Sequence, residues 1–502
     1  MDVEDLPGHN HGPLPSPITH SFPHINKPHV HHHKHTWSTR LILAAGAISL
    51  GSSIPLGYNI GIINVQSKPI DDWLKAIIVL EHDFHFTISE EVLKYIFAFG
   101  GIVGSILSLW LADHLGRKNS ILFSNFITIF SCILCVVTPS TQAVEVLLIA
   151  RLLSGVSSGM VTSIAPMYLL ELSPLRLKGA MGATFTLGLA VGIFCSHILG
   201  LTTVLGTRES WSVLLALQGV FILMSWLLLM FLPESPRFLY SVKGMKQNAI
   251  MELSALRGVT LKQAEIELKD HNAPIGDPWT LRRLISLQDL RVQLAVLCVL
   301  FVGQQFTGIE YVLNNSLEHF EDINLDDGVN ARIAGFFIYM IHCFLSVVML
   351  YIVNKCRRKR LLVVSCSLSG LCLILITISL TFKTDWWPTI SVISLLLYVS
   401  SFTIGLQPIP YFMGAEMFDV GPRSSAMAVG SAVHWLSRLA ALLLLSTLQS
   451  LLQQYIFLIF AFVTAFVAVF TQWCLPETKL NLRRKSLPHA APKRVSFQDE
   501  DP

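Results

Sequence analysis

The sequence predicts an all-α membrane protein in which twelve transmembrane helices form two six-helix repeats. Three observations lead to this prediction. The 502 residues are 52% hydrophobic and 14% charged, with a mean hydropathy of +0.57, whereas soluble proteins carry about 25% charged residues. Twelve apolar runs come close to the ~20 residues with which a helix crosses a ~30 Å hydrocarbon layer. Short motifs also recur at a nearly constant offset between the two halves of the chain.

Polar or charged breaks separate the twelve apolar runs. The predicted spans cover residues 41–63, 92–112, 120–138, 144–168, 179–201, 211–232, 291–314, 332–353, 361–382, 389–414, 424–446 and 455–475. The predicted regions are a His-rich tail over 1–40 that we expect to be disordered, a six-helix bundle over 41–232, a helical linker over 233–290, a second six-helix bundle over 291–475, and a tail over 476–502.

The internal repeat is visible in residues that follow equivalent spans. P-E-S-P-R at 233–237 follows the sixth span and P-E-T-K at 476–479 follows the twelfth, an offset of 243 residues. Glu171 after the fourth span and Glu416 after the tenth differ by 245. Two similar six-span halves are the architecture of major facilitator transporters, in which the substrate binds near the bilayer midplane between the halves.

Lysine and arginine gather in alternate loops and so predict the orientation. One set of loops holds Arg117 and Lys118, the basic series from Arg237 to Arg283, and the cluster from Lys355 to Arg360, while the other set holds few basic residues. Short cytoplasmic loops carry the excess of basic residues. Both termini and the linker are therefore predicted to be cytoplasmic, in a multi-pass protein that we expect in the plasma membrane.

Several function classes find no support in the sequence. The net charge of +3 and the pI of about 8.3 are too balanced to indicate nucleic-acid binding. The nine cysteines lie mostly in apolar runs and imply no disulfide framework. No P-loop and no constellation around a nucleophile occurs, so we expect neither an enzyme nor a cofactor. Nine of the eighteen histidines fall within 9–35, which we interpret as a tail with incidental metal affinity rather than a metal site.

A charged turn joins the second and third predicted spans. The chain reads GGIVGSILSLWLADHLGRKNS over 100–120, where glycines allow close helix packing. Asp113, Arg117 and Lys118 place charges that can lock neighbouring helix ends. This segment resembles the signature loop of the major facilitator superfamily.

Further motifs narrow the resemblance. They are GYNIGIIN at 57–64, PMYLLELSP at 166–174, PESPRFL at 233–239, GQQFTGI at 303–309, PIPYF at 408–412, GPR at 421–423 and PETK at 476–479. Together they resemble the sugar-porter family, nearest its animal facilitative glucose and fructose transporters, over roughly residues 40–480. The resemblance implies uniport of a hexose or a related small polar solute by alternating access, with that solute and the lipid bilayer as partners. It gives no oligomeric state.

The resemblance also implies a set of gating charges. In the family, glutamates at the positions of Glu171 and Glu416 pair with basic residues a turn or two later and hold the cytoplasmic side closed. Arg423 fits the second basic position, and Lys178 replaces the usual arginine of the first. The alternative is that these residues are solvated helix ends, because an isolated surface ion pair contributes little.

Two glutamines are the leading candidates for binding substrate. Gln304 and Gln305 match a pair of sugar-binding glutamines on span seven of the family. An amide side chain both donates and accepts hydrogen bonds, which suits neighbouring sugar hydroxyls. The alternative is that the two amides join helices to one another.

Other positions depart from the family's pattern. They hold Thr186 on span five, Glu310 on span seven, His342 on span eight, Thr403 and Tyr411 on span ten, and His434, Trp435 and Arg438 on span eleven. The common direction is from neutral amides to ionisable groups. We expect Glu310 and Arg438 to face one cavity, where a charge needs a partner or water. They either neutralise each other or bind a charged or zwitterionic solute.

Coupling to protons depends on a position in the first span. Proton-coupled members of the family carry an aspartate where this chain has Asn59, and an amide does not titrate. This favours facilitated diffusion, although Glu310 with His342 could supply a displaced proton site. The alternatives are a transporter of a charged or zwitterionic organic solute, with or without proton coupling, and a sensor that binds solute without moving it.

Overall fold

The computed structural model describes residues 37–80, 89–201, 204–207, 209–271, 279–314, 328–382, 386–475 and 477. These residues contain helices and connecting loops and no strand. The expectations for the His-rich tail and the C-terminal tail fall almost wholly outside the described residues.

Twelve helices within the described residues are long and apolar enough to cross a membrane. The first half comprises α1 (Thr39–Leu50) with α2 (Ser53–Val65), α4 (Glu90–His114), α5 (Arg117–Thr141), α6 (Val144–Leu172), α7 (Lys178–Leu199), and α8 (Trp211–Ala216) with α9 (Gln218–Leu229). The second half comprises α14 (Gln288–Phe306) with α15 (Ile309–Asn314), α17 (Gly328–Lys355), α18 (Arg358–Thr381), α19 (Trp387–Ile404) with α20 (Pro408–Met417), α21 (Val420–Leu452) and α22 (Ile456–Cys474). Each predicted span overlaps one of these helices, so the all-α prediction with twelve spans is confirmed.

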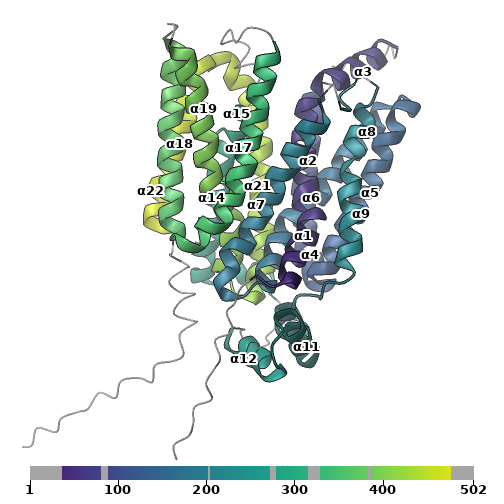
Figure 1. Ribbon diagram of the computed structural model, residues 1–502, viewed down its shortest axis with the longest axis vertical. Coiled ribbons are helices and arrows are strands. Elements are labelled where there is room, and N and C mark those ends of the chain that lie inside the picture. Colours follow the sequence, from purple (N-terminus) through teal and green to yellow (C-terminus); the bar gives the residue numbers. More distant parts are fainter. Residues whose placement is uncertain are drawn as a thin grey trace, which may run out of the picture. The chain divides into compact units, whose positions relative to one another are not determined.

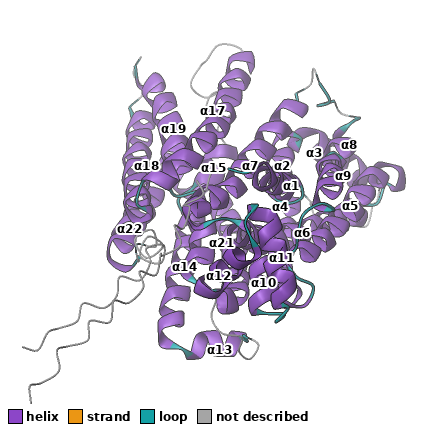
Figure 2. Cartoon of the chain, turned by 60° about the horizontal axis from the view of Figure 1, so that its bottom comes forward, coloured by secondary structure: helices purple, strands orange, loops and turns teal. Residues whose placement is uncertain are grey.

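Shorter helices connect or flank the spans. α3 (Ser67–Leu80) follows the first span, and α10 (Pro236–Ser241), α11 (Lys246–Arg257), α12 (Leu261–His271) and α13 (Leu281–Ser286) lie between the halves in sequence. The end of the spans beside α10 to α13 is called the linker end, at the bottom of Figure 1. Figure 2 brings this end forward.

Two spans of the second half are each broken into two helices. α14 ends at Phe306 and α15 begins at Ile309, with Gly308 between them at a φ of +82°. A Cβ at Gly308 would lie 2.2 Å from the ring of Phe460, so only glycine fits this turn. A second break separates α19 from α20 at Gly405 to Gln407. Broken helices expose backbone carbonyls and are tolerated in a membrane where they line a cavity.

The two halves pack most extensively through two pairs of helices. α4 packs on α21, and α7 packs on α17. In the first contact, the Ser105 and Ser431 hydroxyls lie 2.8 Å apart. Nearer the linker end, the Ser424 hydroxyl donates to Asp113 over 2.7 Å. Of these helices, α7, α17 and α21 contribute residues to the lining of the candidate site.

Candidate functional site

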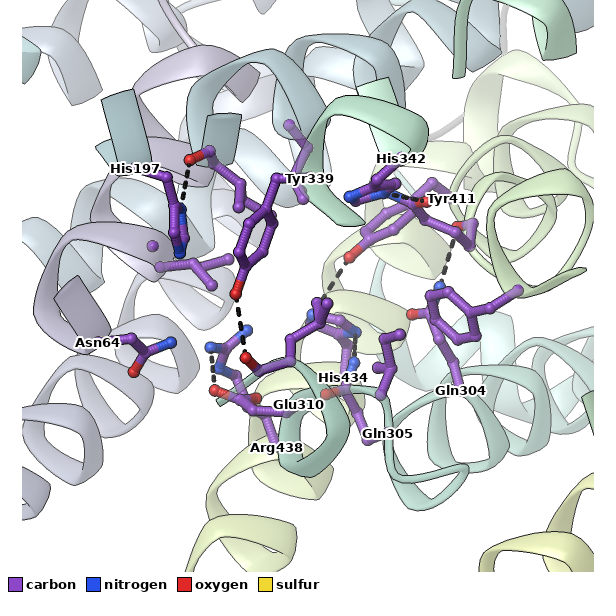
Figure 3. Close-up of a pocket in the computed structure, with 18 residues that line it drawn as sticks. Asn64, His197, Gln304, Gln305, Glu310, Tyr339, His342, Tyr411, His434 and Arg438 are labelled. Atoms are coloured by element: carbon purple, nitrogen blue, oxygen red, sulfur yellow. Dashed lines mark hydrogen bonds and ion pairs between the residues drawn. The ribbon is translucent and has the colours of Figure 1, made fainter. Parts of the chain in front are cut away.

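A cavity lies between the halves and encloses about 690 Å³ of empty space, including its open part. α2 and α7 form one wall, and the broken spans α14–α15 and α19–α20, with α17 and α21, form the other. Its polar lining residues are Asn64, His197, Gln304, Gln305, Glu310, Tyr339, His342, Gln407, Tyr411, His434 and Arg438 (Figure 3). Apolar residues, among them Ile60, Leu189 and Ile193, complete the lining.

Gln304 is held in place by the break between α19 and α20. Its Nε2 donates to the carbonyl oxygens of Leu406 and Gln407, at 3.0 and 2.9 Å. These carbonyls are available because the helix is interrupted there. The Oε1 of Gln304 is buried and has no partner among the described residues. The side chain is therefore fixed by its donors and retains an acceptor.

Gln305 belongs to a chain of polar contacts across the cavity wall. Its Nε2 donates to His434 Nδ1 over 3.1 Å, and His434 Nε2 lies 3.4 Å from the Tyr411 hydroxyl. An amide nitrogen only donates, so His434 Nδ1 accepts and Nε2 carries the proton. Phe301 packs edge-on against both rings, at centroid distances of 5.5 Å from Tyr411 and 5.4 Å from His434. This series of polar contacts fixes the direction of each hydrogen-bond donor at this wall of the cavity.

Glu310 and Arg438 line the cavity and pair with each other. Arg438 Nη2 lies 2.5 Å from Glu310 Oε1, and their side chains are 11% and 12% exposed (Figure 3). Glu310 lies on α15, just past the break at Gly308, and Arg438 lies on α21. Both side chains line one cavity, as expected, and each gives the other the partner that a charge needs at this depth.

Two predicted binding residues do not reach the cavity lining. The Thr186 hydroxyl donates to Ala183 O of its own helix over 3.0 Å, because a short side chain on a helix finds a carbonyl nearby. Trp435 is 1% exposed and packs edge-to-face on Phe97 at 5.4 Å. It lies against α4, where a Cβ at Gly101 would meet its ring at 2.2 Å. Trp435 therefore supports the lining residue His434 rather than facing the cavity.

The structure adds lining residues that the motifs did not single out. The rings of His197 on α7 and Tyr339 on α17 stack across the halves with centroids 3.6 Å apart. Gln407 accepts a hydrogen bond at Oε1 from His342 Nε2 over 2.8 Å. Gln407 directly precedes PIPYF, and Asn64 ends GYNIGIIN, so their positions beside motifs were the available signal.

A buried charge cluster joins the halves at the linker end. Glu171 is fully buried and accepts from Arg117 Nε at 3.1 Å and from Arg423 Nη1 at 3.3 Å. The Ser235 hydroxyl also donates to Glu171 over 2.5 Å. Arg117 and Glu171 belong to the first half, and Arg423 begins α21 of the second. The cluster therefore connects the two halves by charge.

The pairing of the gating candidates differs from the expected one. We expected Arg423 to pair with Glu416, the acid seven residues before it, but Arg423 contacts Glu171 across the halves. Glu416 instead receives Arg358 Nη2 from α18 at 3.3 Å. Helical spacing predicts local partners, whereas the packing of α21 on the first half selects a distant one. Lys178 begins α7 and is buried.

The turn between α4 and α5 is stabilised by charge from two sides. Arg117 Nη1 lies 3.2 Å from Asp113 Oδ1. Glu234 accepts from the backbone N–H groups of Arg117 at 3.0 Å and Lys118 at 3.1 Å, so that its carboxylate faces the positive end of α5. Burial raises the pKa of Glu234, and the backbone donors oppose that shift.

A second buried network surrounds Asn59 in the first half. Arg151 Nη1 donates to Asn59 Oδ1 over 2.9 Å, and Asn59 and Gln218 exchange hydrogen bonds. The Arg151 guanidinium also lies over the Phe97 ring at 4.5 Å. Among the described residues, no carboxylate lies within 4.0 Å of Arg151. The cation is therefore held by amides and an aromatic face.

Known proteins resemble this chain over most of its length. A sequence model described as "Sugar (and other) transporter" matches residues 44–482. The rat protein named solute carrier family 2, facilitated glucose transporter member 5, is 31% identical over 453 residues, covering 88% of this chain and 89% of that protein. The mouse facilitated glucose transporter member 3 is 33% identical over 452 residues, covering 88% and 90%.

Solved structures share the fold. The proton:xylose symporter XylE bound to 6-bromo-6-deoxy-D-glucose, a protein of the major facilitator superfamily, superposes with a TM-score of 0.74 at 18% identity, covering 88% of this chain and 96% of that one. The partially occluded inward-open form of XylE from E. coli gives a TM-score of 0.69 at 20% identity, covering 88% and 99%. The predicted major facilitator fold is confirmed.

Proposed function

The chain belongs to the sugar transporter family, and on that premise we propose that it is a uniporter that moves a hexose or a related small polar solute by alternating access. The family and the fold support sugar transport by a multi-pass membrane protein. Sugar transporters are not enzymes, which agrees with the sequence-based expectation. The observation that carries the proposal is the polar cavity between the halves.

The second half supplies most of the hydrogen-bonding groups that we assign to the solute. Gln304 Oε1 is an acceptor without a partner among the described residues, and His342 Nδ1 is in the same situation. Gln305 and Tyr411 add an amide and a hydroxyl. A neutral polyol needs such alternating donors and acceptors and no net charge.

We assign the charged residues at the linker end to the gate that closes the cavity on that side. Contacts from Glu171 to Arg423 and from Asp113 to Ser424 cross between the halves there. Because the halves rock against each other in alternating access, these contacts must break before the cavity opens toward that end. Arg117 supports this gate through its contact with Glu171. We also assign to the gate three residues that lie at the same helix ends: Lys118, Lys178 and Glu416.

Orientation follows from the basic residues. The linker end carries Arg117 and Lys118 and the cluster from Arg357 to Arg360. Under the rule that basic residues stay inside, this end faces the cytoplasm, and both chain termini lie there. The plasma membrane is the location that we propose, by resemblance to animal facilitative transporters.

Transport without protons is supported by the surroundings of Asn59. The amide occupies a position that holds an aspartate in proton-coupled relatives and bonds to Arg151 over 2.9 Å. An amide keeps this bond at every pH, so no proton is taken up or released. An imposed proton gradient should therefore not drive accumulation of the solute.

The test is uptake of radiolabelled glucose and fructose into vesicles that carry the purified full-length protein, at two pH values. Saturable flux that is equal at both values supports the uniporter. Gln304→Ala removes two hydrogen bonds to the α19–α20 break and the free acceptor, and it should lower flux at least tenfold, the loss expected from about 1.4 kcal/mol of transition-state interaction. Gln293→Ala, on the same helix near the linker end and outside the lining, is the control and should transport normally.

Failure has two distinguishable forms. Binding of hexose without flux, from folded protein, would favour a solute sensor. If the folded protein shows no hexose binding and no hexose flux, the hexose assignment is contradicted. The presence of Glu310 and Arg438 in the lining then favours the second candidate function, transport of a charged or zwitterionic organic solute.

A further inference from the structure

We propose that a groove at the linker end of the first half binds one anionic phospholipid. The groove holds about 1340 Å³ of empty space and is lined by the start of α1, the start of α5, the end of α9 and α11. α11 lies below the lower ends of α1 and α9 in Figure 1. The site lies apart from the cavity and goes beyond the proposed transport function.

Two cations in this groove have no acidic partner. Arg40 Nη1 donates to the carbonyl oxygen of Ala255 on α11, and Lys118 Nζ donates to Leu232 O over 2.8 Å. No carboxylate oxygen of the described residues lies within 4.0 Å of the charged nitrogens of either side chain, and the nearby Glu234 carboxylate accepts from the backbone N–H of Lys118. A carbonyl satisfies one donor and neutralises no charge, and a guanidinium has five N–H donors and an ammonium three. Both groups therefore retain donors and charge for a phosphate.

One acidic residue, Glu252 of α11, also lines the groove. With Arg40 and Lys118 the lining carries a net charge of +1 at neutral pH. The groove therefore attracts an anion overall, and the carboxylate reduces the attraction. Removal of the Glu252 carboxylate therefore tests directly whether the groove attracts an anion.

The other wall is apolar and faces outward. Leu43 is 50% exposed, Met230 is 73% exposed and Phe231 is 87% exposed. They lie at the ends of spans, where the hydrocarbon layer meets the headgroups. A soluble anion would leave this surface uncovered, whereas a phospholipid covers it with acyl chains while its phosphate reaches the cations. This combination identifies the ligand as a lipid with a negative headgroup.

Binding would connect three parts of the first half. The headgroup contacts α1 through Arg40 and the start of α5 through Lys118, next to α11. α11 belongs to the linker between the halves, so the lipid would hold the linker against the first half. A ligand that binds only the folded protein raises its stability according to its concentration and affinity.

The experiment follows thermal unfolding of the purified full-length protein in a neutral detergent. Dioleoylphosphatidylglycerol should raise the unfolding temperature in a saturable way, and dioleoylphosphatidylcholine should not. Water-soluble glycerophosphate separates a lipid from a free anion and should also have no effect. Equal shifts with the two lipids, or a shift with glycerophosphate equal to that with phosphatidylglycerol, would overturn the proposal.

Variants locate the site. Arg40→Ala should raise the half-saturating phosphatidylglycerol concentration about fivefold, the factor that corresponds to about 1 kcal/mol per basic residue near an anionic surface. Arg360→Ala removes an exposed arginine at the linker end of the second half and should leave it unchanged. Glu252→Gln should lower it, and this variant decides the question if Arg40→Ala does not fold. An unchanged value in the variants at Arg40 and Glu252 that fold would refute the groove as the site.

Discussion

The ion pair in the cavity and the charge cluster at the linker end differ in burial and in what they join. Glu310 and Arg438 belong to the same half, and each side chain is about a tenth exposed. Glu171 is fully buried, and Arg117 of its own half and Arg423 of the other half share it. A pair within one half can persist while the halves rock, whereas a contact across them must break.

Charged residues therefore have two distinct roles in this helix bundle, one in the cavity lining and one at the contact between the halves. Removing one partner of a buried ion pair is costly because the remaining charge is left without compensation. In the cavity, the uncompensated charge would disturb the lining and weaken solute binding. At the linker end, it would shift the equilibrium between the closed and open states.

The largest effect is expected at Glu171. Glu171→Gln keeps the size of the side chain but leaves Arg117 and Arg423 buried without a carboxylate between them. Breaking a buried pair in this way costs about 3–5 kcal/mol. We expect a loss of this size in the free energy of unfolding, measured by SDS titration of purified protein.

The same variant should also open the linker end. A cysteine placed at Ser431, which is buried against Ser105 between the halves, should react faster with a thiol reagent applied from that end. Glu265→Gln is the control, because Glu265 pairs with Lys269 at 2.6 Å on an exposed face of α12 and contributes little. Unchanged labelling in Glu171→Gln would show that the cluster is not a gate.

A smaller effect is expected at the cavity pair, where the sign of a double variant is informative. Glu310→Gln and Arg438→Gln each leave one charge near the cavity, and each should lower stability and hexose flux. The pair is about a tenth exposed, so the loss should be smaller than at Glu171. The double variant Glu310→Gln with Arg438→Gln restores neutrality, and it should recover most of both quantities.

The double variant also separates the two explanations of the pair. Recovery of stability together with hexose flux means that the charges serve each other. Recovery of stability without flux of any hexose means that a charge is needed by the solute, which supports the charged-solute alternative. Thr403→Ala provides a control on span ten, because Thr403 donates to its own helix at Val399 O and does not line the cavity.

The sequence predicted those features that depend on local composition. Apolar runs predicted the spans, because lipid requires about 20 apolar residues in each helix. Motifs predicted Gln304, Gln305, Glu310 and Arg438 in one cavity, and the structure brings them together. Glycine between Q-Q-F-T and Ile309 marks the break that aims Glu310 inward.

The remaining features depend on packing between distant helices. His197 and Tyr339 stack across the halves, and no local pattern links residues 142 positions apart. Thr186 stands where the family resemblance implies a glutamine on span five, and its short side chain bonds to its own helix instead. Arg423 was assigned to a neighbour in sequence, but the contact of α21 with the first half brings it to Glu171.

The smallest effect is expected at Glu234, beside the linker-end cluster and outside the spans. Burial raises its pKa above the ordinary value, so the folded protein binds this proton more tightly than the unfolded chain does. Stability then falls as the pH rises from the ordinary glutamate pKa through the raised one, and it is gained as the pH falls through the same window. The shift is opposed by the N–H groups of Arg117, Lys118 and Ser235, which donate to the carboxylate.

Glu234→Gln removes this titration and keeps an acceptor for the start of α5. The unfolding temperature of the wild-type protein should therefore rise, relative to that of Glu234→Gln, as the pH is lowered through that window. The comparison between the two proteins cancels the titration of other groups, including the buried Glu171. Parallel curves would mean that the backbone donors fully offset burial, so that folding leaves the pKa of Glu234 unchanged and its titration does not affect stability.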